Sequence, residues 1–198
     1  FSYKYNLERG QYVSFLTTNR SYDGGGSGLL YSSRGYIILD EKYSASFEIA
    51  KSETDEPISD AIATTNGTKN HTYALDGESF SGYGGRFTFR SNSEKSGWNY
   101  EFETKSPDFR TDLGFTNENN WKKHSISGDY KYRSDGVFKF IKLDAASVIM
   151  KNYQNDVLGQ MTRVGSRIEF DNPFEIEFKA ETWNKFKFED YVFNDTYE

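Results

Sequence analysis

The sequence predicts an all-β protein in which long amphipathic antiparallel strands form a transmembrane β-barrel or a large arc of one. Three observations support this fold class. Apolar and polar residues alternate with period two through nearly the whole chain, the alternating runs are long, and 18% of the 198 residues are aromatic. Because a strand sends successive side chains to opposite faces, each run produces one apolar and one polar face. No segment shows a convincing helical period.

The alternating runs follow one another along the chain, beginning at Phe1, and the clearest of them are 43–49, 97–105, 123–133, 164–171 and 174–185. Strands of soluble sheets average about 5–6 residues, whereas membrane-spanning strands need about 9–11. The runs 97–105, 123–133 and 174–185 reach the longer figure. A barrel, or an arc, of about ten such strands is therefore predicted.

Turn signals rich in Gly, Asn and Asp separate the runs, because these residues accept the backbone conformations of tight turns. They lie at 23–28, 94–97, 117–120, 134–136 and 171–173. One much longer break, 52–71, is predicted to be a single excursion from the sheet, since an ordinary hairpin needs far fewer residues.

Composition excludes several classes of protein. The chain has no Cys, so it contains no disulfide, thiolate metal site or cysteine nucleophile. Its 24 Lys and Arg are outnumbered by 30 Asp and Glu, which argues against a nucleic-acid partner, because phosphate binding needs clustered basic residues. No apolar stretch approaches the roughly 18 residues of a membrane helix.

A large β-sandwich is the alternative architecture, because its strands alternate in the same way with their polar faces toward water. Strand length, aromatic content and the presence of only 3 Pro favour the barrel. In a barrel the aromatic residues would form girdles at the two membrane interfaces, whereas in a sandwich exposed Tyr and Trp would stack on sugar rings.

The charged residues predict the inner face of the barrel. If 86–90 and 99–103 form a hairpin, Arg86 faces Glu103 and Thr88 faces Glu101, which places opposite charges across neighbouring strands. A lumen lined with mixed charges suits a solvated or plugged interior. The predicted lining residues are Arg86, Arg90, Glu101, Glu103, Lys131, Arg133, Arg167, Glu169, Glu175, Glu177 and Lys179.

No constellation predicts catalysis or a cofactor. Only two histidines occur, His71 and His124, and neither lies in a nucleophile or zinc motif. The strand carboxylates, such as Glu101 and Glu103, recur with period two beside basic residues, which favours structural lining over a glycosidase pair. The loop acids Glu53, Asp55, Glu56 and Asp60 have the chemistry of Ca²⁺ ligands but no regular spacing, so no metal site is assigned.

The segment Ser-Pro-Asp-Phe-Arg-Thr-Asp-Leu-Gly-Phe at 106–115 resembles the Asp-Phe-Arg-x-Asp/Glu-x-Gly-Phe signature of an uncharacterised outer-membrane family of Bacteroidota and related Gram-negative bacteria. The motif positions are Asp108, Phe109, Arg110, Asp112, Gly114 and Phe115. In that family a C-terminal β-barrel domain of unknown function follows a module similar to family 9 carbohydrate-binding domains. The resemblance covers residues 28–135, and residues 116–121 depart from the family pattern, which has a basic residue there.

Within this motif, Arg110 is predicted to form a charge cluster with Asp108 and Asp112, and Phe109 and Phe115 are predicted to pack as anchors. Pro107 and Gly114 fit a bend that defines the fold. We expect a structural role for the motif rather than a ligand site.

We therefore expect residues 1–198 to be a single outer-membrane β-barrel domain from a longer chain, located in the cell outer membrane. The predicted function is non-enzymatic: an anchor, pore or scaffold in contact with the lipid bilayer, linked to surface glycans or to other outer-membrane proteins. The first alternative is a surface-exposed soluble β-sandwich that binds polysaccharide. The second is an outer-membrane barrel hydrolase, which the missing Ser/His constellation disfavours.

Overall fold

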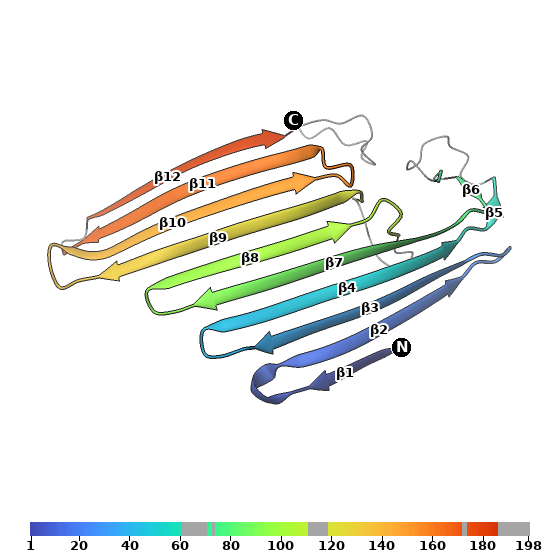
Figure 1. Ribbon diagram of the computed structural model, residues 1–198, viewed down its shortest axis with the longest axis horizontal. Helices are drawn as coiled ribbons and strands as arrows, with labels where there is room; N and C mark the ends of the chain where they lie inside the picture. Colours follow the sequence, from blue (N-terminus) through green and yellow to red (C-terminus); the bar gives the residue numbers. More distant parts are fainter. Residues whose placement is uncertain (61–70, 73, 111–118, 172–173, 186–198) are drawn as a thin grey trace.

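The computed structural model of the chain describes residues 1–60, 71–72, 74–110, 119–171 and 174–185 (Figure 1). Their main feature is one antiparallel sheet of ten strands, and a separate pair of short strands lies beside it. The strands of the large sheet, in spatial order, are β1 (Ser2–Asn6), β2 (Tyr12–Ser21), β3 (Ser27–Ile38), β4 (Tyr43–Asp55), β7 (Ser79–Asn92), β8 (Ser96–Lys105), β9 (Trp121–Arg133), β10 (Phe138–Lys151), β11 (Val157–Phe170) and β12 (Glu175–Lys185). The predicted all-β class with a large antiparallel sheet is confirmed.

The sheet is a meander, because each strand pairs with the one before it and the one after it in the chain. The only interruption lies between β4 and β7, where the short strands β5 (Ile58–Ser59) and β6 (Leu75–Asp76) pair with each other. Strands β2, β3 and β10 were not named individually from the sequence. Consecutive apolar residues such as Leu29-Leu30-Tyr31 and Val148-Ile149-Met150 blur the period-two pattern there.

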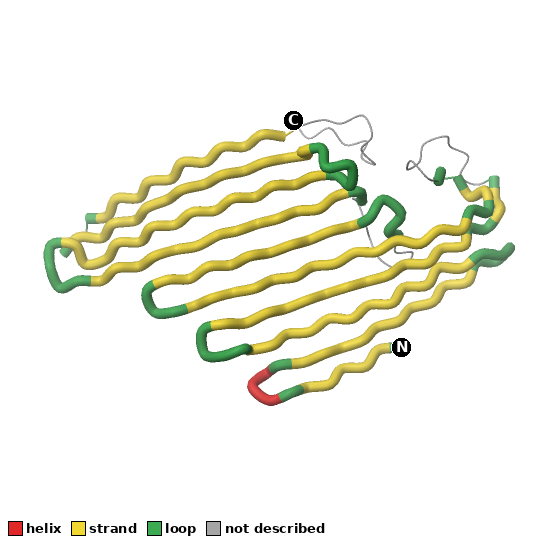
Figure 2. Tube along the Cα trace, viewed as in Figure 1, coloured by secondary structure: helices red, strands yellow, loops and turns green. Residues whose placement is uncertain are grey.

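The two ends of the sheet differ in the length of their connections (Figure 2). At one end the strands are joined through 7–11, 39–42, 93–95, 134–137 and 171–174, and we call this the short-turn end. At the other end, which we call the long-loop end, the connections include 56–78 and 106–120. The predicted excursion at 52–71 begins later than expected. Strand β4 continues to Asp55, and its last residues are polar on both faces, which hides the strand in the sequence.

The sheet is not closed into a barrel, and β1 and β12 form its two edges. Successive hairpins are staggered along the sheet, so that the short turns step steadily in one direction from β1 to β12 (Figure 2). Among the described residues the only helix is the 3-10 turn Glu8–Gly10, and no helical segment could span a membrane.

Candidate functional site

The two faces of the sheet carry different side chains, and the register of the strands decides which residues share a face. One face presents the even-numbered residues of β1, β2, β3, β4 and β7, those of β10 from Phe140 to Met150, and the odd-numbered residues of β8, β9, β11 and β12. A register shift between Phe138 and Phe140 places Phe138 opposite Phe170, on the other face. We call it the charged face and the opposite one the apolar face. All eleven residues predicted to line a lumen lie on the charged face: Arg86, Arg90, Glu101, Glu103, Lys131, Arg133, Arg167, Glu169, Glu175, Glu177 and Lys179.

The centre of the charged face holds a network of two cations and two anions. Arg86 pairs with Glu103 and Thr88 with Glu101 in the strand register, so the predicted hairpin is confirmed. Arg86 Nε donates a hydrogen bond to Glu101 Oε2 at 2.9 Å and lies 3.5 Å from Glu103 Oε1. Lys123 Nζ lies 2.9 Å from Glu103 Oε2. The network is electrically neutral, which lets it sit on one sheet face without an unpaired charge.

The other predicted lining residues have partners of several kinds. Arg167 Nη2 lies 2.9 Å from Glu169 and 3.0 Å from Glu175, and Glu177 is its register partner on β12. The remaining contacts pair Lys131 with Asp129 at 3.2 Å, Lys179 with Glu181 at 3.1 Å, Arg90 Nε with Asn99 Oδ1 at 3.1 Å, and Arg133 with the Phe140 ring at 5.5 Å. Each of these contacts joins side chains that lie on the charged face.

The apolar face is uncovered. Large side chains on this face are between about a third and two thirds exposed, including Phe15, Tyr31, Ile37, Ile49, Tyr83, Phe87, Ile126, Tyr130, Tyr132, Leu143, Val164, Ile176 and Phe178. Among the described residues only Phe109, Trp121 and Leu158 are buried hydrophobic side chains. The sheet is therefore a single layer without a conventional core, and no second described layer packs on this face.

Aromatic rings gather at both ends of the apolar face. Near the short-turn end, Phe89 contacts Tyr43 and Trp98 with centroid distances of 5.9 and 5.3 Å, and Phe170 lies 5.3 Å from Phe138. Exposed apolar side chains such as Ile49 and Ile126 lie between the two ends, and aromatic girdles flanking an apolar band are typical of membrane-spanning sheets.

At the long-loop end, Tyr83 lies edge-on to Tyr153 with centroids 6.0 Å apart, and Lys122 Nζ lies over the Tyr153 ring, 4.4 Å from its centroid. The Tyr153 hydroxyl shares a 2.6 Å hydrogen bond with Thr104 Oγ1. Burial of this hydroxyl raises its pKa above the ordinary tyrosine value, because desolvation disfavours the phenolate. Tyr83, Tyr153 and Lys122 each combine an apolar body with a polar tip, and the three side chains meet at this end of the apolar face.

The first half of the family-like motif folds inward over the long-loop end of the charged face. We call residues 106–110 the inward segment. Phe109 is 6% exposed and its ring lies over Gly84. A Cβ atom on Gly82 would lie 2.2 Å from the Phe109 nitrogen, so only glycine allows the segment to approach this strand so closely. The Arg110 amide donates to Ser52 Oγ at 3.1 Å, which ties the inward segment to β4 as well.

The charged residues of the motif pair with distant segments. Arg110 Nη1 lies 2.5 Å from Glu56 Oε1, and Asp108 Oδ1 lies 3.1 Å from His71 Nε2. The imidazole of His71 also stacks on Phe80 at 3.9 Å. The predicted packing of Phe109 is confirmed. Arg110 also reaches Glu56 in the β4–β7 connection, and its predicted pairing with Asp112 lies outside the described residues. Asp112, Gly114 and Phe115 lie outside the described residues.

The two histidines have different surroundings. His71 lies in the β4–β7 connection, is largely buried and contacts Asp108 and the Thr72 carbonyl oxygen. His124 lies on the apolar face of β9, where its Nδ1 is 2.9 Å from the Tyr100 hydroxyl and its ring is 4.8 Å from Phe102. His71 is therefore a mostly buried loop residue, whereas His124 is an exposed residue near the start of a strand.

A hollow of about 230 Å³ opens on the charged face beside the inward segment. It is lined by charged side chains of the central strands and by two aromatic rings, namely Glu48, Arg86, Glu103, Lys105, Phe109 and Trp121. Such a lining can hold water, ions or a small polar solute.

Sequence reasoning missed three parts of this arrangement. Lys123 shares the parity of Lys131 and Arg133, so the alternation of β9 already places it on the charged face. The run Gly82-Tyr83-Gly84-Gly85 signals a close backbone approach to a strand. The ion pairs of His71 and Arg110 join residues far apart in the chain, and no local pattern predicts them.

Comparison of the chain with protein-family models, with curated protein sequences and with solved structures finds no match. The resemblance of residues 106–115 to an outer-membrane family therefore stays an expectation.

Proposed function

We propose that the chain forms part of the wall of a transmembrane β-barrel in an outer membrane, where it serves as a non-enzymatic anchor, pore wall or scaffold. The observation that carries the proposal is the uncovered apolar face, with exposed Ile, Leu, Val, Phe, Tyr or Trp on each of the ten strands. Soluble monomers rarely expose a continuous apolar patch larger than a few hundred Å². Acyl chains are the occupant that matches the shape and chemistry of this face.

The lengths and ends of the strands also support a bilayer as the solvent of the apolar face. Strands β2 to β4 and β7 to β12 contain 10 to 14 residues each, which is enough for a tilted strand to cross about 30 Å of hydrocarbon. A β-sandwich would instead cover such a face with a second sheet about 10 Å away. The described residues provide no such sheet.

The orientation of the strands is compatible with a barrel wall. Closing a sheet requires tilted strands and a steady stagger of the hydrogen-bond register, and the hairpins step in one direction across the sheet (Figure 2). Strands β1 and β12 run antiparallel to each other, as the first and last strands of an even-numbered barrel do. Short connections at one end and longer ones at the other are also typical of outer-membrane barrels.

In this arrangement the charged face lines the interior. Its ion pairs satisfy one another and remain accessible to water, while the inward segment narrows the space at the long-loop end. The link to surface glycans rests on the family resemblance alone, and the hollow beside Trp121 is the place where a small polar solute would first be sought.

Three tryptophans make the orientation testable. Trp98 lies on the apolar face, whereas Trp121 and Trp183 lie on the charged face. We expect a variant that keeps only Trp98, folded into vesicles of brominated phosphatidylcholine, to lose most of its fluorescence. A variant that keeps only Trp183 is expected to be quenched by aqueous acrylamide and little affected by the brominated lipid.

As a control, the fluorescence of the two single-tryptophan variants is measured in detergent micelles without brominated lipid. This control reports any change of folding that the substitutions cause. The proposal fails if the chain is a folded monomer in plain buffer, or if Trp98 is shielded from brominated lipid while the chain is bound to the vesicles. Either result supports a soluble sandwich-like assembly in which another layer covers the apolar face.

A further inference from the structure

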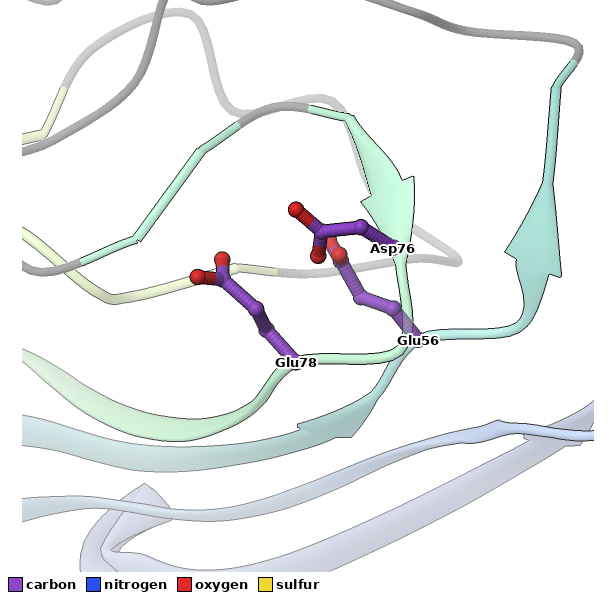
Figure 3. A group of neighbouring side chains, drawn as sticks. All are labelled: Glu56, Asp76 and Glu78. Carbon is purple, nitrogen blue, oxygen red and sulfur yellow. The ribbon is translucent and has the colours of Figure 1, made fainter.

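Three carboxylates meet where the β4–β7 connection leaves and rejoins the sheet (Figure 3). Glu56 follows β4 directly, Asp76 ends β6, and Glu78 precedes β7. One carboxylate oxygen from each of the three lies within 4.8 Å of one oxygen from each of the others. The Glu56 amide donates to the Glu78 carbonyl oxygen at 2.9 Å, so the two chain segments that carry these side chains are held together.

Glu56 is the unusual member of the group, because its side chain is 0% exposed. Its Oε1 is paired with Arg110 at 2.5 Å, but Oε2 is buried and accepts no hydrogen bond from the residues that the structure describes. Buried carboxylate oxygens are normally satisfied by a donor or a metal ion, since leaving one without a partner costs free energy. Figure 3 shows the Glu56 carboxylate beside that of Asp76, and this places the orphan group within the cluster.

Thr72 orients the other two carboxylates. Its amide donates to Glu78 Oε2 at 2.8 Å, and its hydroxyl donates to Asp76 Oδ2 at 3.0 Å. Each of these bonds uses one carboxylate oxygen and leaves the second oxygen for another ligand. The three acids carry three negative charges and Arg110 supplies one positive charge, which leaves an excess of two negative charges at this point.

We propose that Glu56, Asp76 and Glu78 bind one Ca²⁺ ion. The donor set consists only of hard oxygen atoms, which Ca²⁺ and Mg²⁺ prefer. Two oxygens bound to the same Ca²⁺ ion can lie up to about 5 Å apart, and the 4.8 Å span falls inside that limit. Mg²⁺ demands a tighter octahedral shell, whereas Ca²⁺ accepts irregular sets that combine several side chains with water.

The ion would neutralise the excess charge and cross-link the end of β4, the β5–β6 hairpin and the start of β7. Through the Glu56–Arg110 pair the same ion would also hold the inward segment in place over the charged face. This inference does not depend on the proposed membrane role, because the cluster lies outside the ten-stranded sheet.

The test is calorimetric titration of CaCl₂ into the full chain, folded in detergent micelles and freed of metal by chelation. We expect saturable binding of one ion with a dissociation constant of roughly 10⁻⁴ to 10⁻³ M, as for weak extracellular sites. Asp76→Asn is the decisive variant, because this side chain is exposed and its loss leaves the buried Glu56–Arg110 pair intact. We expect it to weaken binding at least about tenfold, since ligand charge sets Ca²⁺ affinity.

The matched control is Asp60→Asn, which removes an exposed acid from the same connection but outside the cluster, and it should bind Ca²⁺ as the wild type does. A second variant, Glu78→Gln, guards against an effect specific to Asp76 and should also weaken binding. Circular dichroism checks that each variant is folded. The proposal is overturned if the wild type gives no saturable heat, or if Asp76→Asn and Glu78→Gln titrate like Asp60→Asn.

Discussion

The apolar and charged faces belong to the same ten strands, yet they are stabilised in different ways. Adjacent residues such as Ile126 and Ser127 lie on opposite faces, and Ile126 is more than half exposed. On the charged face the side chains find partners within the sheet, as Arg86, Glu101, Glu103 and Lys123 do. The apolar side chains leave much of their surface without protein neighbours. The charged face is therefore largely self-sufficient, while the apolar face depends on a second apolar medium.

The largest expected effect on stability is the difference between two single variants that place a lysine at adjacent positions, one on each face of the sheet. Ile126→Lys puts an ammonium group in the middle of the apolar band, and we expect it to reduce folding stability in a bilayer by about 2–4 kcal/mol, the cost of Lys near the midplane. Ser127→Lys, on the charged face, is expected to change stability by less than about 0.5 kcal/mol. Urea unfolding of both variants in lipid vesicles measures the difference. Equal effects would mean that the two faces have the same surroundings.

The second prediction concerns the inward segment, which covers one end of the charged face and has no counterpart among the described residues of the apolar face. Gly82→Ala places a methyl group 2.2 Å from the Phe109 nitrogen and must displace the segment, at a cost of about 1–3 kcal/mol. Gly159→Ala is the control on the same face, because its nearest neighbour is at an ordinary 3.7 Å. Protease sensitivity near residues 106–110 and the unfolding midpoint report the outcome. If Gly82→Ala behaves as Gly159→Ala does, the inward segment does not pack on β7.

The two faces were predictable from the sequence because they depend on strand parity alone. Residues such as Arg86, Glu103 and Glu177 alternate with apolar neighbours, and any antiparallel pairing that keeps the apolar side together places them on one face. The Arg86–Glu103 pairing followed in addition from the position of the turn between β7 and β8. Local rules therefore sufficed for the faces of the clearly alternating strands, but not for β2, β3 and β10, whose consecutive apolar residues blur the pattern.

The long-loop end was not predictable in the same way. Arg110 reaches Glu56, and Asp108 reaches His71, across segments that approach each other only after the sheet has formed. The sequence assigned no metal site, and the loop acids it singled out for their Ca²⁺-ligand chemistry included Glu56 but not Asp76 or Glu78, because the spacing of these three residues follows no repeating ligand pattern. Contacts of this kind depend on tertiary folding and leave no periodic signal in the chain.

The third prediction concerns the hydroxyl group of Tyr153, at the long-loop end of the apolar face. Tyr153→Phe removes the hydroxyl that is hydrogen-bonded to Thr104 and should cost about 0.5–1.5 kcal/mol. Because the pKa of Tyr153 is raised in the folded state, the folded chain keeps this hydroxyl protonated above pH 10.0, where the unfolded chain ionises it. The advantage of the wild type over Tyr153→Phe should therefore shrink as the pH rises above 10.0.

Unfolding midpoints of the wild type and of Tyr153→Phe measure this change at about pH 8 and about pH 11, which lie below and above the ordinary tyrosine pKa of about 10. Tyr130→Phe is the control, since Tyr130 is about half exposed on the same face. A constant difference between wild type and Tyr153→Phe across this range would show that the Tyr153 hydroxyl is equally solvated in both states.

The smallest expected effect concerns the self-sufficiency of the charged face. A double-mutant cycle of Arg86→Gln and Glu101→Gln should give a coupling free energy of about 0.2–1 kcal/mol, the range for partly exposed pairs. The pair Lys139–Asp171, whose Nζ and Oδ1 are 2.8 Å apart near the short-turn end, is more exposed and should give no measurable coupling. Salt should weaken the first coupling only modestly, because Glu101 is only 14% exposed and its partners surround it. If both cycles give zero coupling, the ion pairs contribute no more to stability than separate solvated charges would. The two faces would then differ only in the exposed apolar side chains of the apolar face.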